Sequence, residues 1–236
     1  MLLALDTATE WVHLALLGDD NAWSKRVLTS PANNASKVLL HSVDELLQEA
    51  KAQRSAISGV IACIGPGGFT SLRVGIATAE GLGVLGLQTW GFSAFELRAF
   101  AIKEENPTQK KQVTLVLDGQ RGEAFVQTWD MAEMRPVAKA SRIPLKGLHS
   151  VIGENHWWTT SKFFPSVAIH TLPPPIVLMD EGHATLTALA KLGRACSQRQ
   201  PENTLPPFYL RETDAELNFP NASAHLNEAH RQGQSR

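Results

Sequence analysis

A glycine-rich turn at the end of an apolar run is the part of the sequence best suited to hold a phosphate. Residues 63–83 read CIGPGGFTSLRVGIATAEGLG, and their first half has the strand–turn–helix order of a phosphate-binding loop. Backbone N–H groups at the start of such a helix can hold an anion. The candidate residues for this role are Gly65, Gly67, Thr70 and Arg73.

Neither of two familiar phosphate-binding templates fits this turn. A Walker A loop needs a lysine followed by serine or threonine, and GPGGFTS contains no lysine. A dinucleotide-binding fingerprint needs a third glycine, but Thr70 stands there after Gly65 and Gly67. Anion binding stays open in its generic form. The alternative is that the glycines only make a sharp turn, with Thr70 or Ser71 capping the helix.

The helix after the turn carries a stripe of small residues. Gly75, Ala79 and Gly83 are spaced by four and share one helical face. Glycine inside a helix costs about 0.5–1 kcal/mol relative to alanine. Its use twice on one face predicts that something packs closely against the backbone. The partner would be the neighbouring helix, residues 36–51, or another subunit.

The elements around the turn predict an α/β lobe. Three strand-like segments (LLALDT, WVHLALLG and AWSKRVLT) follow one another and indicate an antiparallel meander. A helix over residues 36–51, with Asn34 or Ser36 as its N-cap, comes next. It is followed by ISGVIACIG, which is typical of a strand covered on both faces. After the glycine turn and its helix, we expect a short strand and a helix in which Ser93 and Glu96 have capping-box spacing.

A polar segment, KEENPTQKKQ, divides the chain into two predicted lobes. Residues 1–105 would form the first lobe. Residues 106–217 would form a smaller α/β lobe whose last helix could pack back on the first. Residues 218–236 are polar and are expected to be disordered. Phe208 and Tyr209 would fix the extended segment before this tail to the body of the protein.

The second lobe begins with a predicted hairpin, VTLVLDGQRGEAFVQTWD. Its tip carries Asp118, Arg121 and Glu123. These side chains indicate either a solvated turn or a charged contribution to a cleft between the lobes.

This order of elements, with an acidic residue closing the first strand, is similar to the α/β actin-like fold (ASKHA, ribonuclease H-like) with its two lobes. In such proteins Asp, Thr and Gly after the first strand face a nucleotide phosphate, and Asp6 and Thr7 are the corresponding candidates here. Ala8 replaces the glycine, and its Cβ would crowd a phosphate. The alternative role of Asp6 and Thr7 is to stabilise a tight hairpin turn.

Composition excludes several classes of protein. The chain has 236 residues, of which 43% are hydrophobic and 19% charged, so it is expected to be globular. Its net charge of −1 excludes nucleic-acid binding that relies only on a strong basic field. Cys63 and Cys196 lack metal-ligand spacing, so we expect reduced thiols and no metal site. No signal peptide or membrane span is evident, which predicts a cytoplasmic protein with no membrane contact.

The chain resembles the TsaB (YeaZ) family of bacterial proteins with the actin-like fold. The resemblance rests mainly on LDTATE, residues 5–10, and GPGGFTSLRVG, residues 65–75. LDGQRGEAF, residues 117–125, and PPFYLR, residues 206–211, match less strongly. The family's loop usually has the order Gly-Pro-Gly-Ser-Phe-Thr-Gly, so Gly and Ser are exchanged here, and an asparagine stands where the family often has a histidine at the start of its first helix.

The resemblance implies a non-catalytic subunit required for threonylcarbamoylation of adenosine 37 in tRNAs reading ANN codons. It implies a heterodimer with TsaD, activation of TsaD and recruitment of the TsaE ATPase, with a homodimer when TsaD is absent. It implies no cofactor of its own, ATP only within the complex, and tRNA contact only through the complex. TsaD relatives carry a paired-histidine metal motif, whereas none of the eight histidines here has His-x-x-x-His spacing. The implied partner interface lies on the first-lobe helices, with candidates His41, Leu72, Gly75, Ile76, Ala79 and Gly83.

Two other functions compete with this one. An active ATPase or phosphotransferase would bind nucleotide at Asp6, Thr7 and the Gly65 loop, but it is supported by the fold alone. A peptidase is the third alternative, although no combination of nucleophile, base and orienting group stands out in the sequence.

Overall fold

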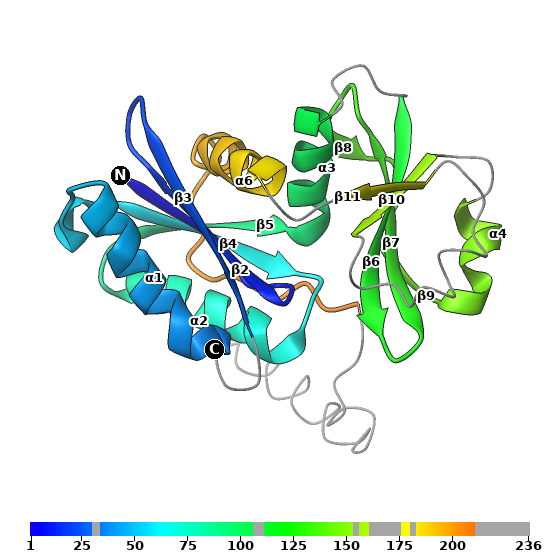
Figure 1. The fold of residues 1–236 in the computed structure, drawn as a ribbon, viewed down its shortest axis with the longest axis horizontal. Coiled ribbons are helices and arrows are strands. Elements are labelled where there is room, and N and C mark those ends of the chain that lie inside the picture. The colour runs from blue at the N-terminus through cyan, green and yellow to red at the C-terminus, as the bar shows by residue number, and fades with distance from the viewer. Residues whose placement is uncertain (30–33, 106–110, 153–155, 161–175, 180–182, 211–236) are drawn as a thin grey trace, which may run out of the picture.

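Two α/β lobes make up the part of the chain that the structure, a computed structural model, describes (Figure 1). The described residues are 1–29, 34–105, 111–152, 156–160, 176–179 and 183–210. No helix within these ranges combines the length and the apolarity that crossing a bilayer requires.

The first lobe is built on a five-stranded sheet in the order β3-β2-β1-β4-β5. Its first three strands pair antiparallel as a meander, and β1, β4 and β5 are parallel to one another. The central strands are buried on both faces because helices cover both sides of the sheet. The strands are β1 (Leu2–Asp6), β2 (Trp11–Leu17), β3 (Ala22–Leu28), β4 (Gly59–Gly65) and β5 (Gln88–Ser93).

Two helices lie on each side of this sheet (Figure 1). Alternate residues of β1 contact opposite layers: Leu5 lies against α2 at Gly75, and Ala4 lies against α6 at Gly193. The first pair is α1 (Ala35–Glu49) and α2 (Phe69–Val84), with a short 3₁₀ turn η1 (Arg54–Ala56) after α1. The second pair is α3 (Ala94–Glu105) and α6 (His183–Cys196).

The second lobe has a six-stranded sheet that repeats the pairing pattern of the first. Strands β6 and β7 form an antiparallel hairpin. Strands β10 and β11, which come later in the sequence, extend the sheet in parallel on the β6 side. Strands β8 and β9 both pair with β7. The elements are β6 (Gln112–Gln120), β7 (Glu123–Asp130), β8 (Arg135–Pro136), β9 (Ser141–Pro144), η2 (Leu145–Gly147), α4 (Leu148–Ile152), β10 (His156–Thr160) and β11 (Ile176–Met179).

The predicted meander, the doubly covered strand, the hairpin and the four long helices are all confirmed. The cap predicted for α3 is also present, since Ser93 Oγ accepts a hydrogen bond from the Glu96 N–H at 3.0 Å. Helix α6 follows the second sheet in sequence but packs on α3 and the first sheet. The predicted disordered tail, residues 218–236, lies outside the described residues.

Candidate functional site

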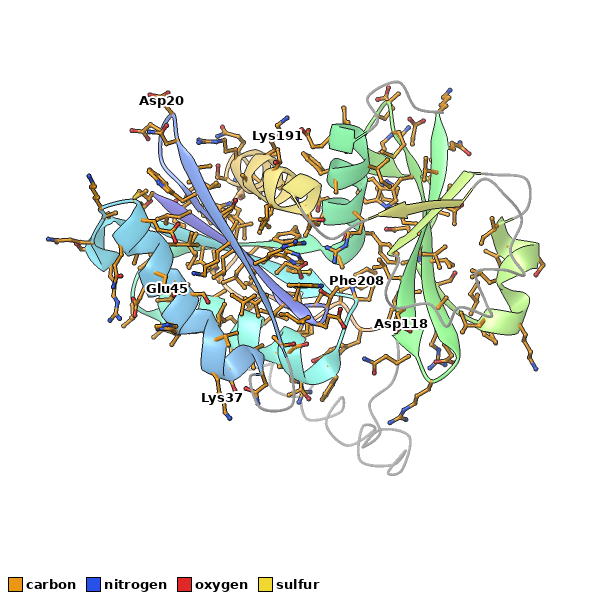
Figure 2. All side chains as sticks on the ribbon, viewed as in Figure 1. Asp20, Lys37, Glu45, Asp118, Lys191 and Phe208 are labelled. Atoms are coloured by element: carbon orange, nitrogen blue, oxygen red, sulfur yellow. The ribbon has the colours of Figure 1, made fainter. Side chains whose placement is uncertain are left out.

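A cleft of about 540 Å³ lies between the lobes, at the ends of α1 and α2 where both helices begin. The first lobe contributes the Thr9 turn, Asn34 and the glycine loop, and the second contributes Asp118 and Gln120 from the hairpin β6–β7. Figure 2 shows Asp118 on the side of the second lobe that faces the first. The hairpin tip, predicted to be either solvated or part of a cleft, therefore does both: Arg121 is exposed, whereas Asp118 lines the cleft.

The glycine loop is closed against the turn that follows β1. A Cβ added to Gly67 would contact the Ala8 carbonyl oxygen and lie 2.6 Å from the Ala8 Cβ, so only glycine fits here. The Gly68 N–H donates to the Ala8 oxygen at 2.8 Å. One of the backbone N–H groups that could have held an anion is therefore already bonded within the chain.

Gly68, and not Thr70 or Ser71, is the N-cap of α2. The helix begins at Phe69, so the two hydroxyl residues lie inside its first turn and cannot cap it. Ser71 Oγ donates to the Gly68 carbonyl oxygen at 3.1 Å. The predicted cap was two or three residues too late, because the helix begins directly after the last glycine of the loop.

Gly65 leaves space for the C-terminal segment at Phe208, a contact for which the sequence has no local signal. It has φ +112°, precedes a cis peptide bond to Pro66, and a Cβ here would lie 2.8 Å from the Phe208 carbonyl oxygen. The Phe208 N–H donates to the Ile64 oxygen at 2.7 Å. The prediction that Phe208 helps to fix the C-terminal segment is confirmed, and the glycine loop is its docking point.

Asp6 is buried and paired, and it does not line the cleft. Its carboxylate lies 3.0 Å from Arg98 Nη1, accepts the Ala8 N–H at 2.8 Å, and lies 3.7 Å from Nδ1 of buried His13. Burial alone would raise the pKa of this carboxyl group, but the Arg98 charge, His13 and the Ala8 N–H outweigh it and leave the pKa below its ordinary value. Thr7 is also buried, and its Oγ1 faces Gly75.

This arrangement leaves little chemistry for Asp6 to perform in the cleft. Its charge is neutralised by Arg98, which itself lines the cleft. Within the described residues, no group of three or more His, Cys, Asp or Glu side chains could hold a metal ion. Sequence reasoning missed Arg98, although a signal existed: it is a single arginine among the apolar positions of SAFELRAFAIKEE.

Arg73 lies outside the described lining of the cleft and makes contacts on the surface of α2. Its guanidinium stacks on the Phe69 ring at 3.8 Å, and its Nε donates to Tyr209 Oη at 2.9 Å. The structure therefore places Arg73 outside the lining of the cleft, engaged with Phe69 and Tyr209. The expectation that Tyr209 fixes the C-terminal segment is confirmed.

The stripe of small residues on α2 contacts the protein's own sheet. A Cβ on Gly75 would meet Thr7 and lie 3.1 Å from Leu5, and one on Gly83 would lie 3.0 Å from Thr89. The predicted close packing is confirmed. The predicted partner, either helix 36–51 or another subunit, was wrong, because the two glycines pack against β1 and β5. Leu72, Ile76 and Ala79 are buried on the same side.

The opposite side of α2 is exposed, and it also has the i, i+4 spacing of a single row. We call these residues the outer row of α2: Phe69, Arg73, Ala77, Gly81 and Leu85. Of the predicted interface residues, His41 on α1 is exposed, with 75% of its side chain accessible and its Nε2 3.6 Å from Glu45. The outer row could not be recognised from the sequence, because small residues lie on both the buried and the exposed side of α2 and do not distinguish the two.

Comparisons with known proteins agree on family and fold. A family model described as TsaD, tRNA N6-adenosine threonylcarbamoyltransferase, matches residues 29–153, just over half of the chain. A comparison with curated protein sequences gave no match. The structure of YeaZ from Pseudomonas aeruginosa aligns with TM-score 0.70 and 24% identity, over 89% of this chain and 99% of that chain.

Two further solved structures are similar. A Pseudomonas aeruginosa protein described as having similarity to peptidase YeaZ aligns with TM-score 0.67 and 24% identity, over 89% of this chain and 99% of that one. A Bacteroides thetaiotaomicron protein described as having an actin-like ATPase fold aligns with TM-score 0.46 and 8% identity, over 80% and 95%. The resemblance to TsaB (YeaZ) is thereby confirmed. The chain belongs to the TsaD family, tRNA N6-adenosine threonylcarbamoyltransferase, and has the two-lobed α/β fold of YeaZ.

Proposed function

We propose that this chain is a non-catalytic subunit required for threonylcarbamoylation of adenosine 37 in tRNAs reading ANN codons. It binds the transferase TsaD through α1 and α2, activates it and helps to recruit the ATPase TsaE. ATP enters only within the complex, and tRNA is contacted only through it. The chain works in the cytoplasm and forms a homodimer when TsaD is absent.

The observation that carries the non-catalytic assignment is the Asp6–Arg98 pair. An actin-like phosphotransferase needs its first-strand aspartate in the cleft, beside the phosphates. Here that aspartate is buried and neutralised by a guanidinium at 3.0 Å. Separating the pair would leave an uncompensated buried charge, which is costly.

Exposed apolar side chains support α1 and α2 as the docking surface. Seven large hydrophobic residues are exposed in the described part of the chain, and four of them lie on these helices or at the end of α2. These four are Leu40 at 60% exposure, Phe69 at 40%, Val84 at 87% and Leu85 at 76%. Four of these seven exposed side chains therefore lie on the two helices or at the end of α2, which supports the helices as a protein-binding surface.

A reconstituted modification assay tests the proposal. Purified chain, TsaD and TsaE from the same organism, with ATP, the threonylcarbamoyl donor and unmodified tRNA, should form modified adenosine much faster than the same mixture without the chain. Equal rates in the two mixtures would overturn the proposed function.

The competing ATPase hypothesis has a separate test. Calorimetry of the isolated chain with magnesium and ATP should show neither micromolar binding nor turnover if Asp6 stays paired with Arg98. Micromolar binding with hydrolysis by the chain alone would favour the enzyme instead.

A further inference from the structure

The Arg73 guanidinium is held in one orientation on the surface of α2. Phe69 lies under it at 3.8 Å, and Tyr209 Oη accepts its Nε–H at 2.9 Å. The two aromatic rings contact each other with centroids 5.3 Å apart, which ties them together. Holding the guanidinium in this way removes much of the side-chain entropy that an exposed arginine would otherwise lose on binding.

Arg73 has no carboxylate partner among the described residues, unlike four other arginines of the chain. Arg54, Arg142 and Arg199 pair with Asp44, Glu123 and Glu96, and buried Arg98 pairs with Asp6. No carboxylate in the described part of the chain lies within ion-pair distance of Arg73, and its Nη1 and Nη2 groups have no described acceptor. A guanidinium whose Nη edge is open and whose plane is fixed matches the two oxygens of a carboxylate.

The surroundings of Arg73 favour a protein carboxylate over a nucleic-acid phosphate. Arg73 is the single cation of α2, and its neighbours in the outer row are Phe69, Ala77, Gly81 and Leu85. A phosphate backbone is usually held by several cations together. The one acidic residue of α2, Glu80, is engaged by the Leu205 N–H at 2.9 Å and does not compensate Arg73.

We propose that Arg73 is a docking cation, held in place by Phe69 and Tyr209, for an aspartate or glutamate side chain of TsaD. The inference rests on the proposed function, because it assigns the partner's contact on the same surface. Tyr209 then acts through Arg73 as a positioning residue, and the C-terminal segment becomes part of the binding surface.

The test is a double-mutant cycle on the affinity for purified TsaD, measured by calorimetry with the full chain. Arg73→Met should weaken binding about tenfold or more, because it leaves the partner's carboxylate unpaired. Arg73→Lys should lose part of the affinity, since an ammonium cannot make the bidentate contact. Tyr209→Phe should weaken binding less than Arg73→Met, and should have no further effect in the Arg73→Met background.

Arg142→Met is the matched control, because it removes a paired arginine from β9 of the second lobe and should leave the affinity unchanged. Raising the salt concentration should weaken the wild-type complex more steeply than the Arg73→Met complex, which a merely structural role of Arg73 would not produce. Urea unfolding of each variant checks that the fold is retained.

Three outcomes would count against the inference in different ways. Wild-type affinity in Arg73→Met would overturn it and leave the proposed function intact. Unchanged TsaD affinity with weaker tRNA binding by the assembled complex would show that Arg73 contacts phosphate, and would also overturn it. Absence of TsaD binding by the wild-type chain would overturn the proposed function, and this inference with it.

Discussion

Asp6 and Arg98 are 92 residues apart in the sequence and meet in the interior of the first lobe. The pair joins the end of β1 to α3. The pair therefore stabilises the fold and keeps the Asp6 carboxylate out of the lining of the cleft. The pairing with Arg98, and not the aspartate side chain alone, determines the role of Asp6 here.

Arg98→Met tests the cost of breaking this pair. The variant leaves the Asp6 charge buried without its main partner, so the free energy of unfolding should fall by about 3–5 kcal/mol. Urea denaturation measures the change. Lys191→Met is the control, because its pair with Glu104 is on the surface; it should cost less than about 1 kcal/mol. A loss for Arg98→Met as small as that for Lys191→Met would contradict this account of the pair.

Two glycines in the same loop–helix unit should respond oppositely to the same substitution. Gly67→Ala places a Cβ against the Ala8 backbone and should destabilise the fold by about 1–3 kcal/mol. Gly81→Ala places its Cβ in open space on an exposed helix and should stabilise it by about 0.5–1 kcal/mol. Urea unfolding of both variants measures the signs. A Gly67→Ala variant that is not destabilised would show that the loop does not fit against Ala8 as described.

At the scale of elements, the C-terminal segment from residue 199 to residue 210 is not a strand, but separate hydrogen bonds fix it to β4, β5 and α2. The Glu202 N–H donates to Thr89 in β5 at 2.7 Å, the Phe208 N–H donates to Ile64 in β4, and the Leu205 N–H donates to Glu80 in α2. The segment thus connects the first sheet with the docking helix.

Hydrogen exchange tests how this segment is held. The amides of Glu202, Leu205 and Phe208 should be protected, because each donates to a described acceptor. Glu80→Ala should remove the protection of Leu205 alone, since the other two amides bond to backbone oxygens of the sheet. Exchange of all three amides at unstructured rates in the wild-type chain would contradict the described contacts.

The sequence was sufficient to predict most elements, because the strands of the first sheet and the amphipathic helix α1 have clear hydrophobic periods. It was insufficient for the orientation of α2, where Gly75 and Ala79 on one side and Ala77 and Gly81 on the other give no contrast. Pairings over long sequence distances, such as that of Asp6 with Arg98, also have no local signal.

At the scale of the whole molecule, the two lobes repeat one pattern of strand pairing, but the first carries the features that we connect with function. Its helices α1 and α2 both begin at the cleft, and exposed apolar side chains lie on α1 at Leu40 and at the two ends of α2. The cleft therefore adjoins the proposed docking surface.

A substitution in the middle of the outer row should abolish TsaD binding while leaving the stability of the fold unchanged. Ala77→Glu adds a charge at an exposed position of α2, so it should leave the unfolding free energy nearly unchanged. It should nevertheless prevent TsaD binding, because the new carboxylate lies four residues from Arg73 on the same helix face and pairs with the guanidinium that the partner's carboxylate would need. Ala138→Glu, at an exposed position of the second lobe, is the control and should bind like the wild type. Normal binding by Ala77→Glu would exclude the outer row as the docking surface.

The most direct test of the central claim is the mass of the species formed when the purified chain is mixed with TsaD, measured by light scattering coupled to gel filtration. We predict a complex containing one copy of each subunit for the wild-type chain. A mixture that shows only the masses of the separate proteins, at concentrations well above micromolar, would contradict the account.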